Sequence, residues 1–314
     1  MRLILAIWLL VFAAVPVLAD AIDDARAALV AQDNDELDEA IRLYTRAIQS
    51  RELNNRFLSI AYYNRGSVHF VARDYRAAIT DFDSATVIRP GYAQAYNNMG
   101  NVYVALDAYQ QAVVAYDEAI LVRPDYALAY SNRGNAHTGA GFYQRAMADY
   151  DLAIGLAPDF AKAYKNRANA KYFLGRYAAA MVDYEAALEI DPFDTYSMMW
   201  RYLAALRNRD DPAEAVEALR SGLRDVDAER WPAVVAHHLL GRSTAEEVMA
   251  EIDGGDTAKR VERQCEAYFY LASARLIAGD RQAAARLYQD SIATDVKRFI
   301  EYIGATIDLE RLDQ

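Results

Sequence analysis

The chain contains one 34-residue unit four times between Ser59 and about Thr195. Each copy carries a small residue, an alanine, an aromatic residue, a second alanine and a proline at the same intervals. These marks are Gly66, Gly100, Gly134 and Ala168; Ala78, Ala112, Ala146 and Ala180; Phe82, Tyr116, Tyr150 and Tyr184; Ala85, Ala119, Ala153 and Ala187; and Pro90, Pro124, Pro158 and Pro192. A period kept in register over four copies is typical of a solenoid, whose units bury their apolar faces against one another. The repeat therefore predicts one elongated body with a binding surface, and it disfavours catalysis.

We number each unit from Ser59, Ala93, Ala127 or Ala161 as position 1. Position 4 is then tyrosine in every copy, and the copies follow the pattern Tyr-x2-(Arg/Met)-(Gly/Ala), Ala-x3-aromatic-x2-Ala, Pro. This pattern resembles the tetratricopeptide repeat. The resemblance implies an all-α fold, a right-handed superhelical solenoid of about six helical hairpins plus extra C-terminal helices. In each hairpin the small residue at position 8 of helix A lets helix B approach closely, and the proline ends helix B.

Two positions of the unit change together. Position 7 is Arg65, Met99, Arg133 and Arg167, and position 23 is Asp81, Ala115, Asp149 and Asp183. Arginine and aspartate thus occur together in three copies and are both missing from the second. We predict an ion pair between helices A and B, which sets the helix register more than it adds net stability, because desolvation offsets most of the attraction. The alternative is that these arginines contact a ligand.

The N-terminus has an apolar run from Leu3 to Ala19 behind Met1-Arg2. A charged start, a short apolar core and the ending Val17-Leu18-Ala19 predict a secretory signal peptide over residues 1–19, cleaved after Ala19. The alternative is a retained membrane anchor, although the run is at or below the ~20 residues that span a bilayer. Asp20 stands where a lipid-bearing cysteine would follow, so we expect no lipid attachment. The predicted location is the periplasm, with membrane association only if the N-terminal segment is retained.

The charge and cysteine content exclude some classes of partner. Removing residues 1–19 takes away only Arg2 among the charged side chains, so the net charge goes from −11 to −12. This acidity disfavours nucleic acid and anionic lipid, whose phosphates require concentrated Lys and Arg. Cys265 is the one cysteine, so no intrachain disulfide can form, and its place in a predicted helix favours a buried structural thiol.

The regular repeats divide the chain into further segments. We interpret residues 20–58 as a degenerate first repeat with a long connection over residues 50–58, residues 59–194 as four regular repeats, and residues 195–314 as degenerate repeats and capping helices. In the last segment, Ser243 and Glu246 are predicted to form a capping box that opens a short helix. The long connection and the atypical first hairpin favour exchange of this hairpin in a homodimer.

The C-terminal third allows a closer comparison. Its run of Trp231, Leu240-Gly241-Arg242-Ser243, Phe269-Tyr270-Leu271, Gly279-Asp280 and Phe299-Ile300-Glu301-Tyr302 resembles the NlpI-type envelope lipoproteins. The resemblance implies a homodimeric adaptor that brings peptidoglycan hydrolases to an envelope protease. The absence of the lipid-bearing cysteine is a departure from that family, and the adaptor surface can change while the fold stays.

The sequence contains no pattern that requires catalysis. His69 and His137 occupy position 11, a packing position, and the neighbours His237 and His238 face different directions on a helix. Metal-ligand spacing, a glycine-rich phosphate loop, Gly-x-Ser-x-Gly and a Cys–His pairing are all missing from the sequence. We therefore predict a protein that is not an enzyme, with no catalytic residues, cofactor, metal or small-molecule substrate.

Asparagines give the candidate binding site. The family resemblance implies that positions 2, 5, 6, 9, 12 and 13 of helix A line a groove, and asparagine recurs at positions 6 and 9. Asparagine is a middling helix former, so its recurrence needs a reason. Its amide can donate and accept a hydrogen bond to a peptide backbone, which would hold an extended segment. The alternative is that these amides cap contacts between helices. Lys165 with Asn169 resembles one half of the carboxylate clamp of some tetratricopeptide domains, and Arg201 in the next hairpin is the candidate for the other half. We expect an acidic tail near Lys162, Lys165 and Arg201. The predicted peptide-binding residues are Asn64, Asn98, Asn101, Asn132, Asn135, Lys162, Lys165, Asn166, Asn169 and Arg201.

Two functions remain open at this point. The first is a periplasmic adaptor, a homodimer that binds peptidoglycan hydrolases, an envelope protease or both. The second is a monomeric periplasmic receptor for peptide tails, or an assembly chaperone, without a link to cell-wall turnover.

Overall fold

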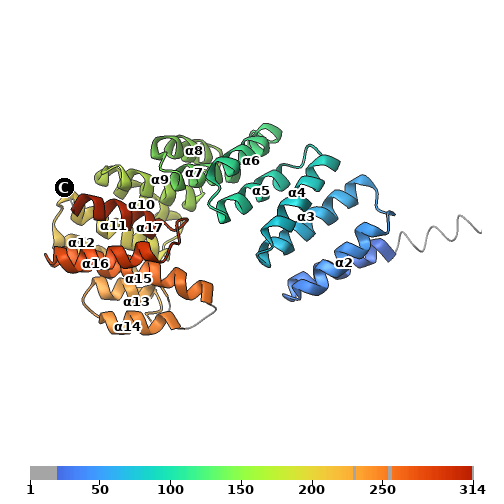
Figure 1. The fold of residues 1–314 in the computed structure, drawn as a ribbon. Coiled ribbons are helices and arrows are strands. Elements are labelled where there is room, and N and C mark those ends of the chain that lie inside the picture. The colour runs from blue at the N-terminus through green and yellow to red at the C-terminus, as the bar shows by residue number, and fades with distance from the viewer. Residues whose placement is uncertain (1–19, 229–230, 254–256, 313–314) are drawn as a thin grey trace, which may run out of the picture. The chain divides into compact units, whose positions relative to one another are not determined.

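A computed structural model describes residues 20–228, 231–253 and 257–312, and this part of the chain is all-α (Figure 1). Its elements are α-helices and two short 3-10 turns, and no β-strand occurs in these ranges. The predicted signal peptide, residues 1–19, lies outside them. None of the described helices combines the length and the apolar character that crossing a bilayer would need.

The regular repeats fold as helical hairpins, as predicted. The first hairpin consists of residues 20–33 and α2 (Leu37–Gln49), which share a core of Ala28, Ala31, Leu43 and Tyr44. The next four are α3 (Asn55–Val71) with α4 (Tyr75–Ile88), α5 (Ala93–Ala105) with α6 (Tyr109–Val122), α7 (Ala127–Gly139) with α8 (Tyr143–Leu156), and α9 (Ala161–Phe173) with α10 (Tyr177–Ile190).

The local sequence explains where these helices end. Each helix B stops two residues before the proline at position 32, since a residue that precedes proline is biased away from the helical conformation. Helix A ends at position 13, and a left-handed residue at position 15 turns the chain into helix B. These residues are Arg73, Asp107, Gly141 and Gly175, with φ of 62°, 55°, 79° and 72°.

The connection after the first hairpin is shorter than predicted. The segment 50–58 was expected to be a loop, but α3 already begins at Asn55. Asn54 caps it, because its side chain accepts a hydrogen bond from the backbone N–H of Phe57 at 3.1 Å. The four additional residues therefore lengthen helix A to 17 residues, compared with 13 in α5.

The C-terminal segment adds seven helices. They are α11 (Thr195–Asn208), α12 (Pro212–Gly222), α13 (Ala233–Leu239), α14 (Ala245–Ala250), α15 (Thr257–Ile277), α16 (Arg281–Ala293) and α17 (Ile300–Leu312), with 3-10 turns at Leu223–Asp225 and Glu251–Asp253. The prediction of a capping box at α14 was one residue out of register. Thr244, not Ser243, is the cap, and its partner is Glu247. The Ser243 hydroxyl instead donates to the Val234 carbonyl at 3.0 Å.

The chain forms two compact units, divided inside α7 between Asn132 and Arg133. In the first unit, buried alanines and aromatics such as Phe82 form the core between hairpins. In the second unit, the largest cluster surrounds Trp200, which stacks on Phe269 at 5.0 Å between ring centroids.

Candidate peptide-binding faces

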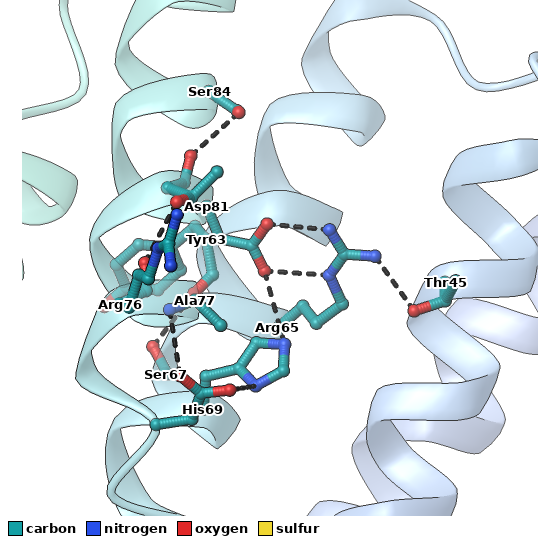
Figure 2. Close-up of polar contacts among 11 residues, drawn as sticks. Thr45, Tyr63, Arg65, Ser67, His69, Arg76, Ala77, Asp81 and Ser84 are labelled. Atoms are coloured by element: carbon teal, nitrogen blue, oxygen red, sulfur yellow. Dashed lines mark hydrogen bonds and ion pairs between the residues drawn. The ribbon is translucent and has the colours of Figure 1, made fainter.

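The predicted ion pair between positions 7 and 23 is present. In the first regular repeat, the Arg65 guanidinium donates two hydrogen bonds, of 2.8 and 2.7 Å, to the Asp81 carboxylate (Figure 2). Its third nitrogen donates to the Thr45 hydroxyl in α2 at 2.9 Å (Figure 2). The same two-bond geometry joins Arg133 to Asp149 and Arg167 to Asp183. These arginines therefore act within and between hairpins, and a ligand is not needed to explain them.

The position-9 asparagines bind tyrosines of their own hairpins. The hydroxyls of Tyr116, Tyr150 and Tyr184 at position 24 donate to Oδ1 of Asn101, Asn135 and Asn169 over 2.7, 2.8 and 2.6 Å. Burial raises the pKa of each of these tyrosines, so that each hydroxyl stays a donor. In the first repeat, position 24 is Phe82 and position 9 is Ser67, whose hydroxyl donates to the Tyr63 carbonyl instead. The asparagines at position 9 thus have a structural partner.

Three position-6 asparagines, Asn98, Asn132 and Asn166, link their helix A to the helix A of the preceding repeat. In the first unit, Asn98 Nδ2 donates to the Tyr63 hydroxyl at 3.0 Å, and Asn132 Nδ2 donates to Asn97 Oδ1 at 3.0 Å and to Asn101 Oδ1 at 3.3 Å. In the second unit, Asn166 Nδ2 donates to Asn135 Oδ1 at 2.7 Å. Asn64 instead lies beside Tyr44 in α2, which is helix B of the preceding hairpin. The amides therefore form ladders along the helix-A faces of each unit.

Exposure separates the candidate asparagines into two sets. Asn169 is buried, with 4% of its surface exposed, so its side chain belongs to the hairpin interior. The other six are half-buried: Asn64, Asn98, Asn101, Asn132, Asn135 and Asn166. An amide has two N–H donors and an oxygen with two lone pairs, so a half-buried amide with one or two internal bonds retains capacity for another.

The structure does not assemble the proposed clamp. Lys162 is exposed on α9, but the Lys165 ammonium is paired with Asp194 at 2.9 Å and lies 5.7 Å from the Tyr196 ring centroid. Arg201 occupies position 7 of the hairpin α11–α12 and points to Glu185 of α10 at 3.7 Å. Arg167 occupies the same position in its own repeat, where it contacts Asp151 of α8 as well as Asp183. Numbering Thr195 as position 1 would have assigned Arg201 to this packing role.

A cavity of about 540 Å³ lies next to the Lys165–Asp194 pair in the second unit. Three aromatic residues line it, Phe193, Tyr196 and Trp231, together with acidic residues that include Asp194 and Asp225. This lining is acidic, so it does not favour the carboxylate of a peptide tail.

Two buried glutamates lie behind the aromatic lining. Glu266 Oε2 accepts hydrogen bonds from Trp231 Nε1 at 2.6 Å and from the Tyr196 hydroxyl at 2.9 Å. Glu301 Oε1 accepts from the Tyr270 hydroxyl at 3.0 Å and from Trp200 Nε1 at 3.3 Å. Burial, with repulsion from Glu301, raises the pKa of Glu266 to about 8, and burial also raises the pKa of Glu301. These bonds join α11 to α15 and α17, which is a structural role.

The remaining chemically reactive side chains lie in packed surroundings. His69 and His137 are next to the Arg–Asp pairs, with Nε2 3.9 Å from Asp81 and 3.8 Å from Asp149 respectively. Cys265 is fully buried, as predicted, and burial raises the pKa of its thiol to about 11. Within the described ranges, no three His, Cys, Asp or Glu side chains are grouped as metal ligands.

Repeated helical hairpins with a packing side and a polar helix-A side define an α-solenoid of the kind that binds proteins. Family models described as tetratricopeptide repeats match residues 19–93, 100–141 and 161–194. The chain therefore contains tetratricopeptide repeats over these residues.

One solved structure shows the same fold, and two others are similar to part of the chain. A tetratricopeptide repeat protein from Parabacteroides merdae ATCC 43184 is 14% identical, with a TM-score of 0.61, over 94% of this chain and 100% of that chain. MamA is 20% identical over 55% of this chain and 93% of its own, with a TM-score of 0.49. YrrB, described as a TPR protein with an unusual peptide-binding site, is 19% identical over 62% of this chain and 97% of its own, with a TM-score of 0.48. At such identities a likeness concerns the fold alone.

Proposed function

We propose that this protein is a non-catalytic scaffold that binds extended segments of other proteins along the helix-A faces of its repeats. The observation that supports this function best is the ladder of half-buried asparagine amides on those faces. Internal hydrogen bonds already order these amides, which lowers the entropy lost when a peptide backbone binds to them. At roughly 1 kcal/mol net for each added hydrogen bond, such a face supports about micromolar affinity.

We propose further that the scaffold works in the periplasm and that its partners are peptidoglycan hydrolases and an envelope protease. The predicted signal peptide and the resemblance of the C-terminal third to NlpI-type lipoproteins support this. The homodimer now depends mainly on that resemblance, because α3 begins at Asn55 and shortens the connection from which, together with the atypical first hairpin, hairpin exchange was inferred.

Quantitative pull-down from envelope extract tests this function. The tagged mature chain should retain cell-wall hydrolases and a protease, and a variant with Asn98→Ala and Asn166→Ala should retain several-fold less. Circular dichroism and urea unfolding of the variant establish that it is folded. Equal retention of the same proteins by both chains would rule out the asparagine faces as the binding surface.

The second candidate is a receptor for acidic peptide tails, in which the Lys165 ammonium, and not the acidic cavity beside it, takes the tail carboxylate. In this function the tail carboxylate displaces Asp194 from the Lys165 ammonium. Asp194→Asn should then tighten the binding of an acidic-tailed peptide, and Lys165→Ala should weaken it, both measured by calorimetric titration. Two variants with unchanged affinity would exclude a carboxylate site at Lys165.

A further inference from the structure

The second regular repeat has an apolar groove where its neighbours have an arginine. The groove lies between α4 and α6 over helix α5 and has a volume of about 560 Å³. Met99 and Ala115 line its interior, and Val87, Pro90 and Val114 line its outer part. Met99 and Ala115 are the residues at positions 7 and 23, where the other regular repeats have the Arg–Asp pair.

The arginine at position 7 has a second function in the other repeats, which is to reach helix B of the preceding hairpin. Arg65 donates to Thr45 of α2, Arg167 pairs with Asp151 of α8, and Arg201 lies 3.7 Å from Glu185 of α10. Asp151 and Glu185 both occupy position 25 of their repeats. A cationic side chain therefore normally crosses the space between one helix B and the next.

At the second repeat, the acid at position 25 of the preceding repeat is present, but the arginine at position 7 is not. Asp83 is the residue at position 25 of the preceding helix, α4, and it lines the groove opposite Met99. Glu118 of α6 lines the same groove, and both carboxylates are exposed. The groove thus combines an apolar interior with two acidic groups at its rim.

The apolar surface continues outside the groove. Val87 is 72% exposed and Val114 is 61% exposed, and Leu121, one helical repeat of seven residues after Val114, is 74% exposed. Contiguous exposed apolar surface with a charged rim is typical of interaction sites. Burying one large apolar side chain there would remove Met99, Val87 and Val114 from water together.

We propose that the α4–α6 groove is a second docking site, separate from the asparagine faces, for a protein segment that carries a large apolar side chain next to an arginine or lysine. The apolar side chain packs on Met99 and Ala115. The cation pairs with Asp83 and Glu118 and so takes the place that Arg65, Arg167 and Arg201 occupy in their own repeats. The net charge of the chain, −11, adds a general attraction for a basic segment.

The repeats themselves provide the test variant. Met99→Arg with Ala115→Asp gives the second repeat the pair found in the other three, so it fills the groove in a way that this fold already accommodates. The urea midpoint of the double variant should equal or exceed that of the parent chain. The matched control is Asn98→Ala, on the helix-A face of the same helix α5.

The binding probe is a phage-displayed library of random 12-residue peptides, selected on the immobilised full chain. We expect enriched peptides with a Leu, Phe, Met or Trp next to Arg or Lys. As synthetic peptides they should bind the double variant at least ~10-fold more weakly than the parent chain and bind Asn98→Ala with parent affinity. Asp83→Asn with Glu118→Gln should weaken the binding of the basic peptide. The same variant should leave the affinity for a peptide with neutral flanking residues unchanged.

Three outcomes would overturn the proposal. They are a selection that yields no peptide sensitive to the double variant, enriched peptides in which the apolar residue has acidic neighbours, and groove-dependent binding that does not change when Asp83 and Glu118 are neutralised.

Discussion

Arg133 and Asp149 show what a single pair of residues contributes to this fold. The Asp149 carboxylate is 4% exposed and accepts hydrogen bonds of 3.0 and 2.6 Å from the arginine. A buried carboxylate that loses its cation retains its desolvation penalty, whereas removal of both charges leaves an apolar contact. The second repeat, with Met99 and Ala115, shows that the fold accommodates that apolar contact.

We therefore predict that Arg133→Ala lowers the free energy of unfolding by about 3 kcal/mol, whereas Arg133→Met with Asp149→Ala lowers it by about 1 kcal/mol or less. Urea unfolding of both variants and of the parent chain measures this difference. Equal losses in the two variants would mean that the pair is not the interaction that matters at this site.

Comparing the four copies predicted one side-chain pair and missed another. The joint change at positions 7 and 23 was visible and gave the correct ion pair. The joint change at positions 9 and 24, Ser67 with Phe82 but asparagine with tyrosine in the other three, was equally visible and explains Asn101, Asn135 and Asn169. By contrast, the hydrogen bond between Trp200 and Glu301 joins residues 101 apart, and no repeated spacing indicates it.

At the scale of helices, the glycine at position 8 controls how closely the hairpin packs. A Cβ on Gly100 would lie 2.5 Å from Cε1 of Tyr116, and the Tyr116 ring cannot move freely because its hydroxyl is bound to Asn101. A Cβ on Gly66 would lie 3.1 Å from both the Asp81 Cβ and the Phe82 ring, and this ring makes no such bond. Replacing glycine by alanine stabilises a helix by about 1 kcal/mol. The steric clash of the new Cβ therefore decides whether the substitution stabilises or destabilises the protein.

Gly100→Ala should therefore destabilise the protein by about 1–3 kcal/mol, the usual cost of overpacking a core. Gly66→Ala should lie within about 0.5 kcal/mol of the parent chain, because the helix propensity offsets a displacement of a few tenths of an ångström. Thermal unfolding followed by circular dichroism compares the two. A larger loss for Gly66→Ala would contradict the packing described here.

The sequence predicts where each helix B ends, but it predicts the helix lengths only in part. Proline at position 32 marks the end of each helix B because it cannot continue the hydrogen-bond ladder. The beginning of α3 was missed because the Asn54 cap lies outside the repeated unit, and the capping box of α14 was missed by one residue because Ser243 and Thr244 are both good caps.

At the scale of the whole molecule, the two units differ in what holds their helices together. The first unit depends on repeated hairpin contacts, whereas the second also has the cluster of Glu266 and Glu301 among tryptophan and tyrosine side chains. The pKa of Glu266 is raised to about 8 in the folded protein, above its ordinary value of 4.5. Between these two pH values the folded chain binds more protons than the unfolded chain, so stability falls as the pH rises.

We predict that the free energy of unfolding falls by up to about 4 kcal/mol between pH 5 and pH 8.5 because of this group. Glu266→Gln preserves an oxygen for the Trp231 and Tyr196 donors and removes the charge, so its stability should depend less on pH. Urea unfolding at several pH values across this range measures how the free energy of unfolding depends on pH in the variant and in the parent chain. Parallel curves for the variant and the parent would show that Glu266 ionises normally.

The central claim is that the helix-A faces bind other proteins, and photo-crosslinking in living cells tests it most directly. A photoreactive amino acid is placed at Gln94 or Lys162, which are exposed at position 2, on the same side of helix A as positions 6 and 9. The control position is Val182 on α10, which is 63% exposed. We predict crosslinks from Gln94 and Lys162 to other proteins and few from Val182. Crosslinks at Val182 equal to those at the two helix-A positions, or none from Gln94 and Lys162, would contradict it.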